Sequence, residues 1–576
     1  MRFTISNLSV MSNINFSHLT IVLSVMSALI AFSGCSSSEE AAQETQAHGD
    51  TYAPHLEEAV TAEFLEEHIS YFASDEMAGR GTGTDEKRQA AEYLADFQRN
   101  LGLEPAGDNG SFFQSFELES RRVDHITFNA WQVDGDDTVS VNESELRPGQ
   151  PASFSRLFGG ESPEEGEVVF AGFGAVDQQR EINHLDGDLE DKWVMVFDDI
   201  PNVVEGDTLV TPEFETRARF NEIMSRHGAA GILVITTTDS DQYRQESRNS
   251  SYQLQQPVGI GLEYRGGLRD RSQPAYMSVS PEMAALFLDI DKDEINEKKQ
   301  NLTDNLQDFS SYNTGYGLTS EPEVVDEIIE ERNVAALLEG SDPDLRDEVI
   351  VISAHHDHMG IGAPDDDGDM IYNGADDNAS GSIGMLASAK ALKQVAEEGN
   401  GPDRSILFLH VAAEEWGLLG SRYYSDHPTV PEENIVANIN MDMIGRWDEQ
   451  HEEQGDSNYV YIIGAEIISS DLNEMLERAN SWSAGVDLNM RYNDLDDPNQ
   501  FYRRSDHWSF GRLEIPFIFF FSGVHEDYHQ PGDTPDKILY DTLSKRVQLI
   551  TATMVEIANA EQPPEIDSQE FLRRTQ

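Results

Sequence analysis

The chain has 576 residues and a formal net charge of −68, and hydrophobic residues make up 38% of it. This length and apolar content allow more than one packed domain and exclude a wholly disordered protein. The charge excludes a nucleic-acid partner, because binding phosphates requires a basic face. The many carboxylates predict a strongly solvated, acidic surface.

The first 35 residues have the features of an export signal. An apolar run over residues 19–32 is too short to span a membrane but has the length of a signal-peptide core. The segment Phe32-Ser33-Gly34-Cys35-Ser36 resembles a bacterial lipoprotein box, although Phe32 stands where leucine is usual. The resemblance implies that Cys35 is lipidated and anchors an exported protein in the cell envelope. An ordinary signal peptide with an incidental cysteine is the alternative.

Residues 36–57 are rich in serine, glutamate, alanine and glutamine. A segment of this composition cannot bury enough apolar surface to fold alone, so we expect a flexible tether. Cys35 is the one cysteine in the chain, and no disulfide can form within it. Stability must come from packing, with bound metal as a further source.

The folded part begins with helical patterning over residues 61–103. Apolar residues recur at helical spacing in residues 64–72 and again in residues 90–97. The glycine-rich turn between them, residues 77–84, lacks the lysine and the preceding strand of a phosphate-binding loop.

Residues 121–319 differ from the preceding helical segment, because their pattern predicts short strands and many turns. Two strands, a helix and a further strand are predicted at residues 168–174, 192–197, 220–227 and 228–235. This order resembles the protease-associated (PA) domain, a small non-catalytic module inserted in several peptidase families. We expect a β-rich PA-like insertion with its core at about residues 163–300. An unrelated β-rich insertion is the alternative.

From about residue 320 the pattern alternates between strands and helices. Such alternation predicts an α/β domain with a mostly parallel central sheet flanked by helices. Three apolar runs each end in an acidic or imidazole group, at residues 349–354, 406–413 and 435–441. The carboxyl ends of such strands are where ligands bind. We assign residues 58–120 and 320–563 to this domain and expect a loose tail at 564–576.

A two-metal hydrolase needs a carboxylate that bridges the ions, together with further nitrogen and oxygen ligands. No cysteine is available there, so histidine, aspartate and glutamate must supply them. Each candidate is weak alone, because acidic pairs are common in this chain and a lone histidine is more often structural. Their positions at the ends of predicted buried strands make them stronger candidates for metal ligands, since a charge there is costly without a partner. The candidates are His355, Asp377, Glu415, Asp442 and His529.

Five motifs together resemble one enzyme family and follow the family's order along the chain. The family comprises the co-catalytic di-zinc aminopeptidases and their relatives, the glutamate carboxypeptidases and the transferrin-receptor ectodomain. The likeness covers about Thr61 to Ala560, apart from the insertion. The motifs lie at residues 354–357, 374–381, 413–421, 440–443 and 528–536.

The resemblance assigns a role to each motif residue. Asp377 would bridge two zinc ions, with His355 and Asp442 completing one ion and Glu415 and His529 the other. Three residues would assist without binding metal. They are Glu414 as the general base, Asp357 as the hydrogen-bond partner that fixes the His355 tautomer, and Tyr528 as a stabiliser of the oxyanion.

The resemblance implies a zinc exopeptidase that binds two zinc ions per chain and acts on peptides, most readily as an aminopeptidase. A dipeptidase similar to glutamate carboxypeptidase is the first alternative. A non-catalytic binding ectodomain is the second, and the complete set of ligand types argues against it.

Overall fold

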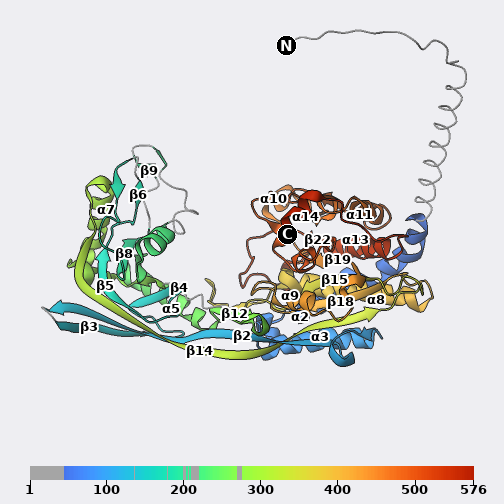
Figure 1. The fold of residues 1–576 in the computed structure, drawn as a ribbon, viewed down its shortest axis with the longest axis horizontal. Helices are drawn as coiled ribbons and strands as arrows, with labels where there is room; N and C mark the ends of the chain where they lie inside the picture. Colours follow the sequence, from blue (N-terminus) through green and yellow to red (C-terminus); the bar gives the residue numbers. More distant parts are fainter. Residues whose placement is uncertain are drawn as a thin grey trace, which may run out of the picture.

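The computed structural model describes residues 45–134, 137–177, 180–198, 203–204, 207–208, 219–268 and 275–575. They form two lobes joined by a long two-stranded ribbon (Figure 1). The expected signal peptide and Cys35 lie outside the described residues. Within the described part of the chain, no helix has the length and apolarity needed to cross a membrane.

The larger lobe is built on a mixed sheet with a parallel centre. Its parallel strands, in spatial order, are β22 (Phe517–Phe521), β19 (Ile435–Met441), β15 (Val349–His355) and β18 (Ser405–Val411). Antiparallel strands flank them, β20 (Tyr459–Gly464) beside β22 and β14 (Tyr312–Leu338) beside β18. The central strands are buried and rich in β-branched residues, as strands covered on both faces require.

Helices cover both faces of this sheet. One face packs against α2 (Ala62–Phe72), α3 (Asp85–Asn100), α8 (Gly381–Glu397), α11 (Ser470–Trp482) and α13 (Tyr540–Ala558). The other face packs against α9 (Leu419–Asp426) and α12 (His507–Gly511). The architecture is the predicted α/β class, with the ends of the parallel strands at one edge.

Two long strands lead from this lobe to the inserted one. Strand β2 (Phe113–Asp134) pairs antiparallel with β14 along most of its length. The predicted domain boundaries, 120/121 and 319/320, therefore fall inside continuous strands. The inserted sheet is also mixed, with four parallel strands and β4 (Phe154–Phe158) at one edge. The four are β5 (Glu164–Phe170), β8 (Trp193–Phe197), β11 (Gly231–Ile235) and β13 (Ala275–Val279).

The inserted lobe contains helices as well as strands. These are α5 (Ser240–Ser251), α6 (Pro281–Leu288) and α7 (Ile295–Asp304). The β-rich description is therefore incomplete for the second half of the insertion.

Both expected loose segments are partly ordered. Residues 45–59 form a helix that buries Tyr52 and Leu56, so the tether prediction is wrong for this stretch. At the other end, α14 (Gln569–Thr575) buries Phe571, and the loose-tail prediction is wrong there too. In each case a few apolar side chains among many polar ones suffice, because a large domain offers a surface to pack on.

Glu556 ties the first helix to the lobe. Its buried carboxylate accepts hydrogen bonds from Arg478 Nε at 3.0 Å and Trp482 Nε1 at 2.8 Å, and it lies 2.9 Å from His48 Nδ1. Burial alone would raise the pKa of Glu556, but these three partners outweigh it and lower the pKa. The residue therefore stabilises the fold in its ionised form.

Replacing Glu556 with glutamine should lower the free energy of unfolding by about 1–3 kcal/mol at pH 7, because charge-assisted hydrogen bonds are lost. The folded pKa lies below the unfolded value, so the stabilisation is complete above the unfolded pKa of about 4.3 and disappears as the pH falls through the folded pKa. Chemical denaturation at pH 7 and pH 3 measures it. The exposed Glu561→Gln serves as control, and an equal loss at both pH values would contradict this role.

Candidate metal centre

The expected ligands all lie at the carboxyl edge of the parallel strands. His355 ends β15, and Glu415 and Asp442 follow β18 and β19 within a few residues. Asp377 lies in the irregular helical segment η8 (Ala375–Ser380) ahead of α8, and His529 lies in the loop after β22. The fold thus brings together five side chains that are spread over 175 residues of sequence.

The two carboxylate oxygens of Asp377 face different partners. Oδ1 lies 3.2 Å from His355 Nε2, which is also 3.3 Å from Asp442 Oδ1. Oδ2 lies 3.2 Å from His529 Nε2, which is also 3.1 Å from Glu415 Oε2. Asp377 therefore stands between two sets of nitrogen and oxygen atoms, as a bridging carboxylate must.

Both sets fit a zinc ion. Ligand atoms arranged tetrahedrally about 2 Å from zinc lie about 3.3 Å from one another, and the separations above match this spacing. Two compact groups of possible metal donors among the described residues share Asp377, one with His355 and Asp442 and the other with His358 and Glu415. Several buried carboxylates so close together are costly unless cations compensate them.

A further histidine lies in the site. His358 Nδ1 is 2.7 Å from Glu415 Oε1 and 3.8 Å from Asp377 Oδ2. The shorter distance is that of a hydrogen bond and is below the spacing of two ligands of one zinc ion. His358 therefore holds one oxygen of Glu415 while the other oxygen faces His529. No feature of the sequence distinguished His358 from its neighbour His356.

Asp357 supports the site differently from the prediction. Its carboxylate lies 3.9 Å from His355 Nδ1, too far for a hydrogen bond, and it is the main-chain carbonyl of Asp357 that lies 3.1 Å from this nitrogen. The carboxylate instead accepts the backbone N–H groups of Glu414, at 3.1 Å, and Glu415, at 3.4 Å. The Asp357 carboxylate therefore orients the glutamates in the turn after β18, and the main-chain carbonyl of Asp357 orients the His355 imidazole.

Glu414 lies among buried acids. Burial raises the pKa of Glu414 well above its ordinary value, and the charges of Glu415, Asp506 and Asp442 add to this while His355 opposes it. A carboxylate with a raised pKa is better matched to proton transfer near neutral pH. Glu415 differs, because hydrogen bonds from His358 and His529 outweigh its burial and lower its pKa to about 2. The pKa values of the adjacent Glu414 and Glu415 are thus shifted in opposite directions.

Tyr528 stacks on His529, with ring centroids 3.9 Å apart. Burial, and then the nearby carboxylates of Asp377 and Glu415, raise the pKa of Tyr528 far above its ordinary value. The phenol therefore keeps its proton and remains a hydrogen-bond donor beside the metal centre.

Arg80, in the glycine-rich turn, connects the loops that carry the expected ligands. Its guanidinium is fully buried and donates hydrogen bonds to four carbonyls, those of Phe72, His356, Asn373 and Gly374, at 2.7–3.1 Å. The turn can approach so closely because a Cβ on Gly79 would lie only 2.4 Å from Tyr372 O. Arg80 was not predicted as a site residue, because its one signal in the sequence is a cation between glycines.

Replacing Arg80 with methionine should destabilise the lobe by on the order of 3 kcal/mol or more, because four buried carbonyls lose a charged donor. Zinc affinity should fall with it, since the segments bearing His355 and Asp377 are no longer joined. Denaturation and competition with a zinc chelator measure both effects. Arg88→Met, at a nearby half-exposed arginine, is the control. Unchanged stability in Arg80→Met would contradict the role of Arg80 in joining these loops.

Two further residues hold the expected ligands. Ser505 donates to Asp442 Oδ2 at 2.6 Å, which leaves Oδ1 toward His355. Asp533 accepts the backbone N–H groups of Asp376 and Asp377 at 3.0–3.1 Å. Ser505 thus contributes to the site from just ahead of α12.

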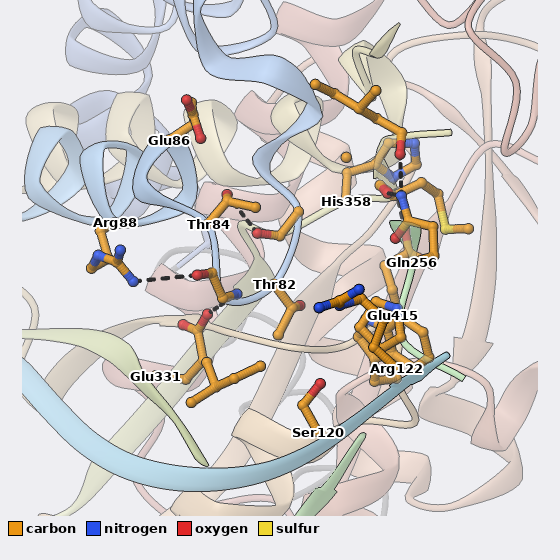
Figure 2. A pocket seen from close by; sticks show the side chains of 18 of the residues that line it. Thr82, Thr84, Glu86, Arg88, Ser120, Arg122, Gln256, Glu331, His358 and Glu415 are labelled. Carbon is orange, nitrogen blue, oxygen red and sulfur yellow. Dashed lines mark hydrogen bonds and ion pairs between the residues drawn. The ribbon is translucent and has the colours of Figure 1, made fainter. Parts of the chain in front are cut away.

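A cleft of about 900 Å³ opens beside the metal centre. His358 and Glu415 line it, together with the glycine-rich turn, residues 327–332 of β14 and residues 255–257 of the inserted lobe (Figure 2). Its volume is typical of a ligand site. The ribbon and the inserted lobe thus form walls of the cleft that Glu415 lines.

The sequence pattern of Peptidase family M28 matches residues 333–554. These residues contain all five expected ligands and Glu414. The larger lobe, hereafter the catalytic lobe, is thus similar to peptidase family M28 over these residues.

Several named relatives of the chain are aminopeptidases. The chain is 28% identical to aminopeptidase YwaD of Bacillus subtilis over 233 residues, which are 38% of this chain and 43% of that protein. It is 26% identical to leucine aminopeptidase 1 of Coccidioides posadasii over 320 residues, 50% of this chain and 77% of that one. The alignment thus covers less than half of the first relative.

A solved aminopeptidase from Aneurinibacillus sp. strain AM-1 has a similar fold, with a TM-score of 0.50 and 18% sequence identity. The likeness covers 89% of this chain and 97% of that one. It confirms the predicted α/β fold class.

Proposed function

We propose that this protein is a zinc-dependent aminopeptidase that removes amino-terminal residues from peptides. The observation that carries the proposal is the placement of Asp377, whose two oxygens face two separate sets of zinc-type donors. The match to the M28 family over residues 333–554 and the aminopeptidase relatives support the same reaction.

Zinc ions held by the two donor sets would lower the pKa of a bound water and polarise the peptide carbonyl. Glu414 would hold the proton taken from the attacking water on its carboxylate and transfer it to the leaving amine. The Tyr528 phenol would donate a hydrogen bond to the oxygen on which negative charge develops. His358 and Asp357 would keep Glu415 and the backbone of Glu414 in place.

The test uses leucine 4-nitroanilide and a leucine-containing tripeptide with a free or an acetylated amino terminus. Hydrolysis of the free forms, its loss on acetylation and its abolition by a metal chelator are expected. Cleavage of the acetylated tripeptide from its carboxyl end would instead favour the glutamate carboxypeptidase-like alternative. No hydrolysis in the presence of zinc would favour a binding ectodomain.

We propose further that the protein is exported and held at the cell envelope by a lipid on Cys35, with the PA-like lobe beside the catalytic lobe. The lipoprotein-box resemblance supports this proposal. Expression in a bacterial host with labelled palmitate should mark the protein, and Cys35→Ser should abolish the label and release the protein from membranes. Label retained in Cys35→Ser would contradict the anchor.

A further inference from the structure

A second cavity, of about 820 Å³, lies between the inserted lobe and the catalytic lobe. Its walls include β12 (Gly259–Leu262) and the start of α9. Trp416, the residue after Glu415, lines both this cavity and the cleft at the metal centre. The two hollows therefore share a wall one residue away from an expected metal ligand.

The charge of this cavity is opposite to that of the protein. Its charged lining residues are four arginines, Arg121, Arg156, Arg265 and Arg422, and one carboxylate, Glu161. The whole chain has 39 basic residues against 107 acidic ones. A cluster of arginines against this background would concentrate anions.

Three of the arginines have partners. Asp326 accepts two hydrogen bonds from Arg121, at 2.7 and 2.9 Å. Arg265 donates to Asp426, with Nε at 2.7 Å. Arg156 donates to the Gly159 carbonyl at 2.6 Å and to Glu161 at 3.2 Å.

Arg422 is different. Its side chain makes no hydrogen bond or ion pair to another described residue, and its Nε is buried without an acceptor. Burial, and then the charges of Arg512 and Arg265, lower its pKa, with Asp426 opposing. A partly buried guanidinium among other cations is energetically costly. A bound anion would offset this cost, and the paired N–H donors of the guanidinium match a carboxylate.

The remaining walls suit part of a peptide. Val258, Ile260, Leu262 and Leu419 provide apolar surface near the arginines. Arg422 lies on α9, which begins four residues after Glu415. A substrate with its scissile bond at the metal centre could therefore extend past Trp416 into the cavity.

We propose that this arginine-lined cavity binds a carboxylate of the peptide substrate, with Arg422 as the principal contact. The carboxylate is either the carboxyl terminus of a short peptide or an aspartate or glutamate side chain. The inference rests on the proposed aminopeptidase function and adds a substrate preference to it.

Four peptides distinguish the two sources. Leu-Gly-Gly and its amide differ only in the terminal carboxylate, and Leu-Glu-Gly-amide and Leu-Gln-Gly-amide differ only in the side-chain carboxylate. Leucine 4-nitroanilide, which has no carboxylate, reports on the metal centre alone. In at least one pair the carboxylate form should have a KM about tenfold lower, the size expected for one charge-assisted hydrogen-bond pair.

Arg422→Gln should remove this preference and leave kcat/KM for the nitroanilide unchanged. Arg422→Lys, which keeps the charge but not the planar fork, should retain part of it. Arg244→Gln, at an exposed arginine of α5, is the matched control and should behave as the wild type. Cleavage with no carboxylate preference, or a preference that survives Arg422→Gln, would overturn this inference alone. No cleavage of any substrate would overturn the proposed function and this inference with it.

Discussion

Replacing Glu414 with glutamine is expected to lower kcat by about a hundredfold to ten-thousandfold, the range for losing a positioned acid–base group. Glutamine keeps the shape of the side chain but cannot accept and return the water proton. Zinc content should stay near two ions per chain, because the side chains around Asp377 are untouched. Steady-state kinetics with leucine 4-nitroanilide and elemental analysis of the same sample measure the two effects.

Glu433→Gln, at an exposed glutamate outside the cleft, is the matched control and should change neither quantity. Near-normal kcat in Glu414→Gln would show that another group takes the proton. Loss of zinc together with activity would show instead that Glu414 binds metal.

Replacing Asp377 with asparagine should weaken zinc binding by more than about a hundredfold, beyond the effect usual for residues that only support a ligand. Both ions should be affected, because one oxygen of Asp377 faces His355 and the other faces His529. Dialysis against a zinc buffer followed by elemental analysis should give well under two ions per chain, and hydrolysis should fall with it.

Asp366→Asn, in the exposed acidic loop nearby, is the control for a general loss of negative charge. If Asp377→Asn retained two tightly bound zinc ions, the bridging role would be wrong. Loss of only one ion would place Asp377 in a single site.

That the site residues lie close together could be predicted from their positions at the ends of strands. His355, Glu415 and Asp442 each follow an apolar run, and parallel strands place their carboxyl ends at one edge. Periodicity alone locates such runs. His529 was harder, since nothing local in its loop distinguishes it, and only the motif resemblance pointed to it.

The supporting residues could not be predicted from local pattern. Arg80 donates to main-chain carbonyls nearly 300 positions away. Every residue has such a carbonyl, so the residue types in the sequence do not indicate the contact. The contacts of Asp357 and His358 depend on how the turn after β18 folds back on the first loop. The turn includes Ala413 in a left-handed conformation, with φ of 55°, which a sequence does not reveal.

The domain limits were missed for a different reason. Strands β2 and β14 run through both lobes, so the chain leaves one domain without a turn or a linker. Composition changes at residues 121 and 319, but backbone pairing does not. The helix at residues 45–59 was hidden by its polar composition, because most of its surface remains in water.

Two zinc ions are expected to lie on either side of Asp377. Anomalous diffraction at the zinc edge, from crystals of the zinc-loaded protein, tests it most directly. We expect two peaks about 3.5–4 Å apart, one beside His355 and Asp442 and the other beside Glu415 and His529. A single peak, or peaks away from Asp377, would contradict the account.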